Sequence, residues 1–185
     1  PTVAAAPLRV PPHNVEAERG VLGSIMLDAG RVLDIAQAQG LTPESFYVPQ
    51  HRALFKIMVD MQRANVAIDM ITMSEHLRNS GLLEDGGPNL IESLIDQTPT
   101  SAHAEYYIEL VLQKHLLRSI IECAREAETN CYADQQSADL VLSNAEQAFL
   151  NIAERRSGFQ GTWPQAVDST IAHINRLLKQ GVGGV

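Results

Sequence analysis

The chain has 185 residues, of which 45% are hydrophobic and 5% aromatic, and its formal net charge is −8. That length allows one domain of about 150 residues with an appendage, and such a domain buries a core without a disulfide or a metal. Scattered β-branched residues and few aromatics disfavour a sheet protein, so we expect an all-α fold. From Glu84 to Glu154 there are 13 acidic and 3 basic residues, a local balance of −10 that should repel phosphate backbones. We therefore expect no direct binding to nucleic acid by this chain.

The two cysteines and the hydropathy pattern indicate a cytoplasmic protein. Cys123 and Cys131 are eight residues apart on one expected helix, which separates them by about 12 Å along its axis, too far for a disulfide. Reduced thiols are usual in the cytosol. No apolar stretch approaches the roughly 20 residues of a membrane span, and no charged-then-apolar leader opens the chain.

The first element in chain order is a proline-rich arm. Four of the first twelve residues are proline, so residues 1–13 are expected to be flexible or extended. Asn14 then suits a helix N-cap, with Glu16 and Glu18 in the first turn, where carboxylates favour the positive end of the helix dipole. Gly20 and Gly23 within this helix predict the close approach of another helix, and Gly30 is expected to break the apolar run into two helices.

Residues 14–100 are predicted to form a globular helical bundle. Thr42 is an N-cap before Pro43, and a further helix follows Pro49. The stretch Thr72 to Glu75 fits a capping box that opens a short helix, which Gly81 should close. A turn-rich connection then precedes a short helix at residues 90–95.

A long antiparallel hairpin is predicted over residues 101–156. Its first helix runs from Ser101 to about Tyr132 without Gly or Pro, some 45 Å, and its second is capped by Ser137. Residues 157–185 are expected to be a linker with a separate amphipathic linker helix at residues 164–180. The stripe of that helix has no remaining chain to cover it and should dock on another subunit; it consists of Val167, Ile171, Ile174 and Leu178.

Searches for catalytic motifs find no phosphate loop, nucleophile elbow, H-E-x-x-H or C-x-x-C, so no catalytic residue, metal site or cofactor is expected in this chain. His13 and Glu16 have metal-ligand spacing but lack further ligands nearby. His51 and Arg52 fit either a recognition cluster or a structural helix start, and the structural interpretation is favoured. A small helical enzyme using Glu16, Glu18 and His51 is the weakest hypothesis, because the chain lacks a nucleophile, a set of metal ligands and a phosphate loop. Glu16 and Glu18 also do not face each other, since neighbours on one helix face are three or four residues apart.

Five ordered blocks of sequence resemble the N-terminal domain of DnaB-type replicative DNA helicases. The resemblance covers about residues 11–156, and residues 157–185 resemble the linker region and linker helix of that family. One departure is GGPNLI, where the family often has an aromatic residue after the two glycines. The blocks are PHNVEAERGVLGSIMLD, FYVPQHRALFKIM, IDMITMSEHL, GLLEDGG and YYIELVLQKHLLRSII.

The resemblance implies an all-helical collar domain that forms dimers and then a hexamer through its hairpin. It also implies binding to the C-terminal domain of primase, leaves a helicase loader open as a further partner, and places ATP and Mg²⁺ in a RecA-like motor domain expected beyond Val185. We therefore expect a module for assembly and partner docking without catalysis of its own. The hairpin residues expected at the interface, some of which must also pair the two helices within one chain, are Ile108, Leu112, Leu116 and Ile120. A free-standing helical adaptor or regulator is the alternative.

Overall fold

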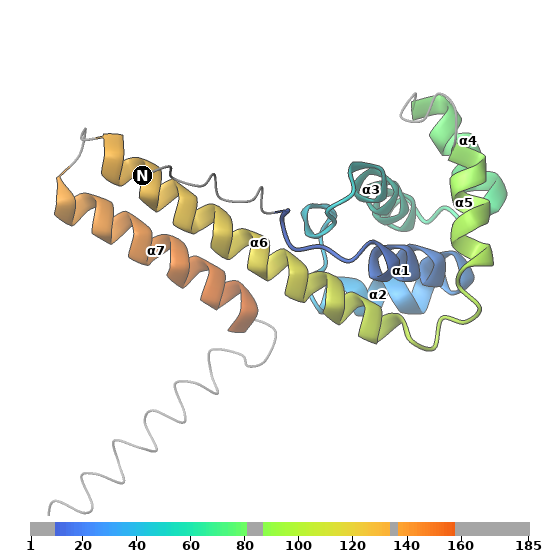
Figure 1. Cartoon of the computed structure of the whole chain (residues 1–185). Coiled ribbons are helices and arrows are strands. Elements are labelled where there is room, and N and C mark those ends of the chain that lie inside the picture. The colour runs from blue at the N-terminus through green and yellow to red at the C-terminus, as the bar shows by residue number, and fades with distance from the viewer. Residues whose placement is uncertain (1–9, 81–86, 134–136, 158–185) are drawn as a thin grey trace, which may run out of the picture. The chain divides into compact units, whose positions relative to one another are not determined.

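The computed structural model describes residues 10–80, 87–133 and 137–157, and in these ranges every regular element is a helix (Figure 1). The all-α prediction is therefore confirmed. The described residues up to Glu122 form one compact unit, unit 1, and those from Cys123 onward form a second, unit 2. The helices are α1 (Val15–Leu27), α2 (Ala29–Ala38), the 3₁₀ helix η1 (Pro43–Ser45), α3 (Pro49–Arg63), α4 (Met70–Ser80), α5 (Gly87–Asp96), α6 (Ala104–Ala133) and α7 (Ala138–Ser157).

Helix α1 begins at the predicted cap. The side chain of Asn14 accepts a hydrogen bond from the Ala17 amide at 2.9 Å, which satisfies one of the amides that a helix start leaves unpaired. The predicted break between two helices exists, but it falls at Asp28 and leaves Gly30 inside α2. Asp28 has a non-helical backbone, and its carboxylate pairs with Arg31 at 2.8 Å. This local pairing explains the break better than the flexibility of a glycine.

The core of unit 1 is formed around α1, which packs against α2, α3 and α5. The two glycines of α1 permit this close packing, as predicted. A Cβ atom on Gly20 would lie 2.7 Å from the ring of Tyr107 in α6, and one on Gly23 would lie 2.6 Å from the Leu94 carbonyl oxygen in α5. The largest fully buried side chains are Phe46, Phe55, Leu22, Ile25, Leu33, Leu54, Met58, Met61, Met73, Leu77, Ile91 and Leu94.

The start of α4 corrects the predicted capping box at Thr72. The helix begins at Met70, and Asp69 is the residue whose carboxylate accepts from the Ile71 and Thr72 amides, at 2.8 and 2.9 Å. The Thr72 hydroxyl in turn accepts from the Asp69 amide at 3.0 Å. Thr72 is therefore the third residue of the helix. Its hydroxyl bonds back to the amide of the capping residue Asp69, so Thr72 is the second member of the capping box and Asp69 is the N-cap. The predicted stop at Gly81 lies outside the described residues.

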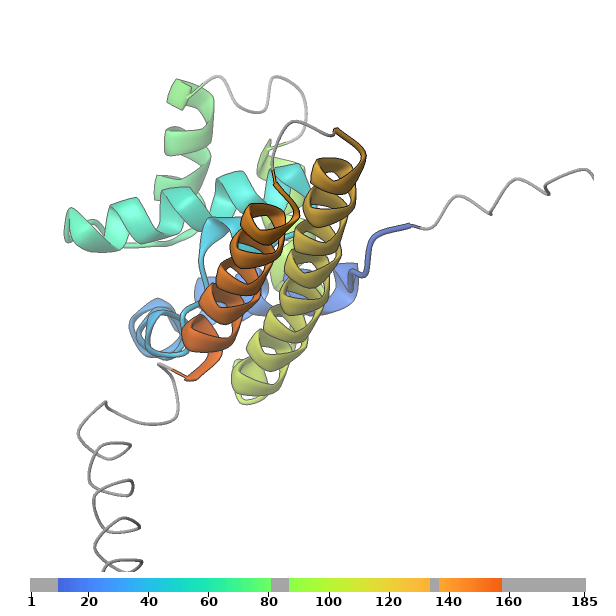
Figure 2. The same ribbon diagram turned by 90° about the vertical axis from the view of Figure 1, so that its left-hand side faces the viewer.

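Helices α6 and α7 match the two predicted long helices. Helix α6 has 30 residues and extends from unit 1 into unit 2, and α7 has 20 residues and starts after Ser137, whose hydroxyl accepts from the Leu140 amide at 3.4 Å. In unit 2 the last turns of α6 lie beside α7, and the two helices run in opposite directions (Figures 1 and 2). The predicted linker helix at residues 164–180 lies outside the described residues. No helix in the described part of the chain is long and apolar enough to span a membrane.

Candidate functional site

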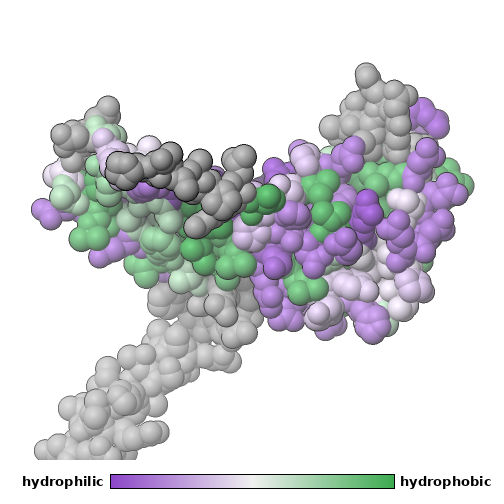
Figure 3. Space-filling model, viewed as in Figure 1, coloured by the Kyte–Doolittle hydropathy of each residue, from purple (hydrophilic) through white to green (hydrophobic). Residues whose placement is uncertain are grey.

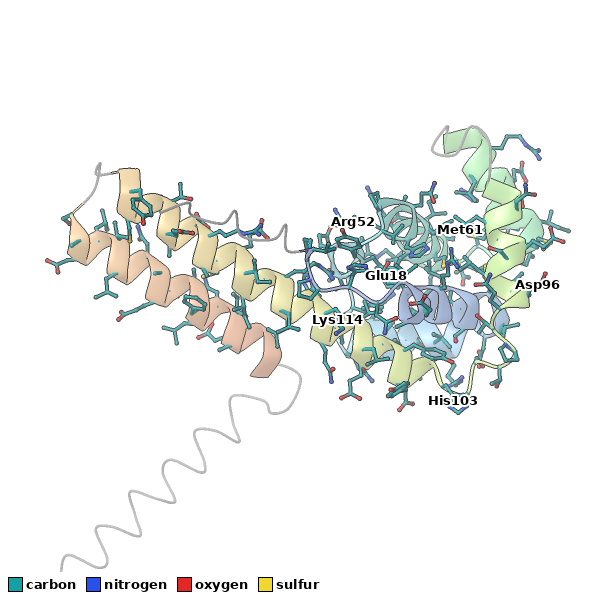
Figure 4. The ribbon with its side chains drawn as sticks, in the orientation of Figure 1. Glu18, Arg52, Met61, Asp96, His103 and Lys114 are labelled. Carbon is teal, nitrogen blue, oxygen red and sulfur yellow. The ribbon has the colours of Figure 1, made fainter. Side chains whose placement is uncertain are left out.

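A buried carboxylate lies at the centre of the polar groups in unit 1. Glu18 points from α1 toward the start of α3 and is almost fully covered (Figure 4). Its carboxylate accepts from the Tyr47 amide at 2.6 Å, from the Val48 amide at 3.2 Å and from Nδ1 of His51 at 2.8 Å. His51 is also buried. The pair fixes the segment between η1 and α3 against α1.

The short segment before α3 is built to present those amides. Thr42 and Ser45 form the predicted cap of η1, in which the Ser45 hydroxyl accepts from the Thr42 amide at 3.1 Å. Phe46 then leaves the helix and is buried against Phe55, with ring centroids 5.0 Å apart. Because Phe46 points into the core, the amides that follow it are directed toward Glu18.

The hydrogen bonds to Glu18 outweigh the penalty of burying it. Burial raises the pKa of this carboxyl group. The hydrogen bonds from the His51 side chain and from the Tyr47 and Val48 amides together lower the pKa by more, so the pKa of Glu18 lies below its usual value. Glu18 is therefore ionised at neutral pH. Breaking such a buried pair by removing one partner leaves an uncompensated polar group and is strongly destabilising.

Arg118 of α6 extends this cluster to the N-terminal arm. Its guanidinium donates to the Pro12 carbonyl oxygen at 2.8 Å and to the Ser45 carbonyl oxygen, and it lies 5.8 Å from the centroid of the Tyr47 ring. The Tyr47 ring stacks on His13 at 4.3 Å. Burial lowers the pKa of Arg118, and the charge of Glu18 opposes that shift. We call the residues Glu18, His51, Tyr47 and Arg118 the Glu18 clasp.

The arrangement of the clasp is that of a structural tie. Glu18 and His51 are covered and bonded to each other, whereas Glu16 is exposed, so the three do not meet in one cleft. Arg52 donates to the Phe46 carbonyl oxygen at 3.0 Å. In the described ranges no group of three or more His, Cys, Asp or Glu side chains could hold a metal ion. The sequence assigned Glu18 to the first turn of a packing helix and missed its burial, because a carboxylate near a helix start has the same sequence pattern in both roles.

Uncovered apolar side chains are the second notable feature. In unit 2 the side chains of α7 include Leu142, Phe149 and Leu150, which are 59%, 41% and 55% exposed. On the face shown in Figure 3, apolar residues gather over α7 and the last turns of α6. In unit 1, α6 exposes Leu117 and Ile121. Contiguous exposed apolar residues on a helix are typical of an interaction surface.

The four predicted hairpin residues lie at different depths in unit 1. Ile108 is fully buried in the core, and Leu112 packs against that core. Leu116 is half-buried, and Ile120 is 38% exposed. The first two therefore serve the packing within one chain, and the part of any of the four in joining copies stays a prediction. The predicted docking residues Val167, Ile171, Ile174 and Leu178 lie outside the described residues.

Comparison with known protein families identifies the family to which this helical chain belongs. Residues 10–113 match the family described as the DnaB-like helicase N terminal domain. The chain belongs to this family. Its curated relatives include the replicative DNA helicase DnaB of Treponema pallidum, 34% identical over 149 residues, and the replicative DNA helicase DnaC of Bacillus subtilis, 33% identical over 155 residues. These alignments cover 80% and 82% of this chain but 34% of each relative, so the chain spans about a third of the length of the relatives it matches.

Solved structures agree with this assignment. The N-terminal domain of DnaB helicase from Mycobacterium tuberculosis superposes with a TM-score of 0.70 and 30% identity, covering 76% of this chain and 99% of that domain. The solved structure of a DnaB-like replicative helicase and its interactions with primase superposes with a TM-score of 0.62 over 88% of this chain and 35% of that one. The second match is 19% identical and supports the fold alone.

Proposed function

We propose that this chain is the module through which a replicative DNA helicase assembles and docks its partners. Membership of the DnaB N-terminal domain family supports this function. The observations that carry it are the uncovered apolar side chains of α7 in unit 2 and, separately, the exposed Leu117 and Ile121 of α6 in unit 1. A helix that exposes several large apolar residues gains stability when a second protein surface covers them.

The residues that we assign to contacts between copies follow from exposure. Ile108 is buried in its own core and Leu112 packs against that core, so the hairpin contact is assigned to Ile120 with its exposed neighbours Leu117 and Ile121. In unit 2 the contact is assigned to α7. The predicted linker helix, with the stripe from Val167 to Leu178, is a further contact in this proposal, made with an adjacent subunit.

The activity of the whole protein is part of the same proposal. The relatives that the chain matches are replicative DNA helicases, and the alignments cover about a third of their length. We therefore assign ATP-driven unwinding, with its ATP and Mg²⁺, to a further domain, and no catalytic step to the residues of this chain. The cytoplasm is the compartment in which such a protein would act.

Sedimentation of the 185-residue chain tests the assembly role. We expect a dimer or a larger oligomer above about 1 µM. Substituting both Leu142→Gln and Leu150→Gln should raise the dissociation constant at least about tenfold, because each change removes apolar area that association buries. The control is Ile71→Gln on α4, an equally apolar residue that is 79% exposed, which should leave the constant unchanged. A chain that sediments as a monomer at about 100 µM would contradict the proposal.

Calorimetry with the C-terminal domain of the primase encoded in the same genome tests the docking role. Support for this partner comes from membership of the DnaB N-terminal domain family, whose resemblance implies binding to primase. We expect a saturable interaction. If the primase domain docks on the dimer, the double variant on α7 should bind it more weakly, whereas docking on a single chain should be unchanged in that variant. Heat changes no larger than those of dilution would contradict the docking role and leave the assembly role standing.

A further inference from the structure

A hollow in unit 1 lies apart from the Glu18 clasp. Its volume is about 290 Å³, close to the lower end of the range for ligand pockets. The first turns of α1, the residues that follow α5 and the first turns of α6 supply its walls, so its shape is held by packed helices. The lining residues that matter here are Glu16, Arg19, Gln97, Thr98, Tyr107 and Leu110.

Arg19 is the cation of this hollow, and its guanidinium is poorly satisfied. Nε is covered and has no hydrogen-bond partner. Nη1 donates to Oε1 of Gln97 at 3.4 Å, a long bond near the limit of useful geometry. In the described part of the chain no carboxylate lies within 4.0 Å of this guanidinium. A covered donor without a partner lowers stability, so stability does not explain the arrangement.

Other arginines of unit 1 show what a satisfied guanidinium looks like in this fold. Arg31 pairs with Asp28 at 2.8 Å and also donates to the Ser101 carbonyl oxygen at 2.9 Å. Arg52 and Arg118 donate to backbone carbonyl oxygens. Arg19 lacks an equivalent acceptor, although it lies at a hollow that has room for one.

We propose that this hollow binds the carboxylate of a glutamate or aspartate side chain on a partner polypeptide, with Arg19 as the cation that holds it. The guanidinium is planar and matches a carboxylate with two parallel hydrogen bonds. When it turns toward the incoming group it gives up only the long bond to Gln97 and brings Nε to an acceptor. The inference rests on the proposed function in one respect, that a docking module has partner polypeptides.

The walls of the hollow set the rest of the specificity. A volume of about 290 Å³ takes one or two side chains and excludes a whole helix. Tyr107 and Leu110 form an apolar wall that fits the methylene groups of the acid or an apolar neighbour. The exposed carboxylate of Glu16 lies at the same hollow and repels all anions, a doubly charged phosphate about twice as strongly as a singly charged carboxylate.

The test uses two short probes that differ by one functional group, N-acetyl-Leu-Glu-amide and N-acetyl-Leu-Gln-amide. Each is titrated into the 185-residue chain while the Nε–H resonance of Arg19 is followed by NMR. We expect the Glu probe to shift this resonance in a saturable way with a dissociation constant of about 1 mM. The Gln probe should bind about tenfold more weakly, because it lacks the charge that strengthens the bonds. Inorganic phosphate at the same ionic strength should shift the resonance less than the Glu probe does.

Two variants decide whether Arg19 is the cause. Arg19→Gln should abolish the preference for the Glu probe, and Arg19→Lys should reduce it, because an ammonium cannot form the paired bonds. Arg63→Gln is the control, since it removes the same charge from an exposed residue of α3 that does not line the hollow. Equal binding of the two probes, a preference that survives in Arg19→Gln, or a stronger response to phosphate would each overturn the inference.

Thermal unfolding separates this role from a structural one. Arg19→Gln should leave the melting temperature unchanged or raise it, because the native side chain carries an unpaired donor. A clear loss of stability would assign Arg19 to the fold and would also overturn the inference. Sedimentation of the same variant should still show the oligomer, so failure here is distinct from failure of the proposed function.

Discussion

Unit 1 and unit 2 are both helical, but they cover their apolar side chains to very different degrees. In unit 1 the side chains of Phe55, Leu22 and Ile91 are completely buried, and the Glu18 clasp ties α1 to the segment before α3. In the described part of unit 2 the buried apolar residues are Cys123 and Val141, at 8% and 9% exposure. Two adjacent helices enclose too little volume to bury both apolar faces. Unit 1 therefore buries its own apolar residues, as an independently folding domain does. The described part of unit 2 instead leaves most of its large apolar side chains exposed.

The largest effect on this comparison should come from opening the clasp. Glu18→Gln keeps the size of the side chain but removes the charge that His51 and two amides satisfy, so we expect a loss of about 2–4 kcal/mol in the free energy of unfolding. Glu16→Gln, two residues earlier and exposed, should change it by less than about 0.5 kcal/mol. Urea unfolding followed by circular dichroism measures both. Similar effects from the two variants would remove the clasp as the main polar tie of unit 1.

The same carboxylate predicts how stability depends on pH. The folded-state pKa of Glu18 is lowered, so its contribution is fully present above the pKa of the unfolded chain. That contribution is lost as the pH falls below the usual glutamate value toward the lowered one. Wild-type stability should therefore decrease more steeply on acidification than that of Glu18→Gln. Parallel curves would show that another group controls the acid limb.

A smaller effect is expected from filling the contact between α1 and α5. Gly23→Ala places a Cβ 2.6 Å from the Leu94 carbonyl oxygen, so the helices must separate and stability should fall by about 1–3 kcal/mol. Gly30→Ala meets nothing within 4 Å and lies in α2, where it should stabilise by up to about 1 kcal/mol. Thermal melts of the two variants measure opposite signs. A stabilised Gly23→Ala would show that α1 and α5 are less tightly packed than described.

Hydrogen exchange at two protein concentrations sharpens the contrast between the units. If association covers α7, dilution from about 100 µM to about 1 µM should reduce the protection of its amides, whereas the amides of α1 should be unaffected. Mass spectrometry of peptides from the two helices gives both values in one experiment. Protection of α7 that is independent of concentration would mean that unit 2 is stable without a second copy.

The smallest expected effect concerns the two thiols of unit 2. Cys131 is exposed and should react with a thiol reagent at once, whereas Cys123 is buried and should react only as unit 2 opens. The ratio of the two rates measures how often that opening occurs. Equal rates would mean that the last turns of α6 are uncovered in solution.

Local patterns in the sequence determined the helices and several of their ends. The cap at Asn14, the turn at Thr42 and Pro43, the start of α7 after Ser137 and the close packing at Gly20 and Gly23 follow from residue types at fixed offsets. Ordered blocks of the chain also indicated the family that residues 10–113 match.

Only the tertiary structure decided which apolar and polar side chains are buried and which are exposed. Ile108 and Ile120 occupy the same helix and the same kind of apolar stripe, yet one is fully buried and the other partly exposed, because the core of unit 1 reaches only one of them. The burial of Glu18 depends on His51, which lies 33 residues away in the sequence and is brought into place by folding. Helical periodicity is a property of neighbours three or four residues apart, whereas burial is set by segments that are distant in the sequence.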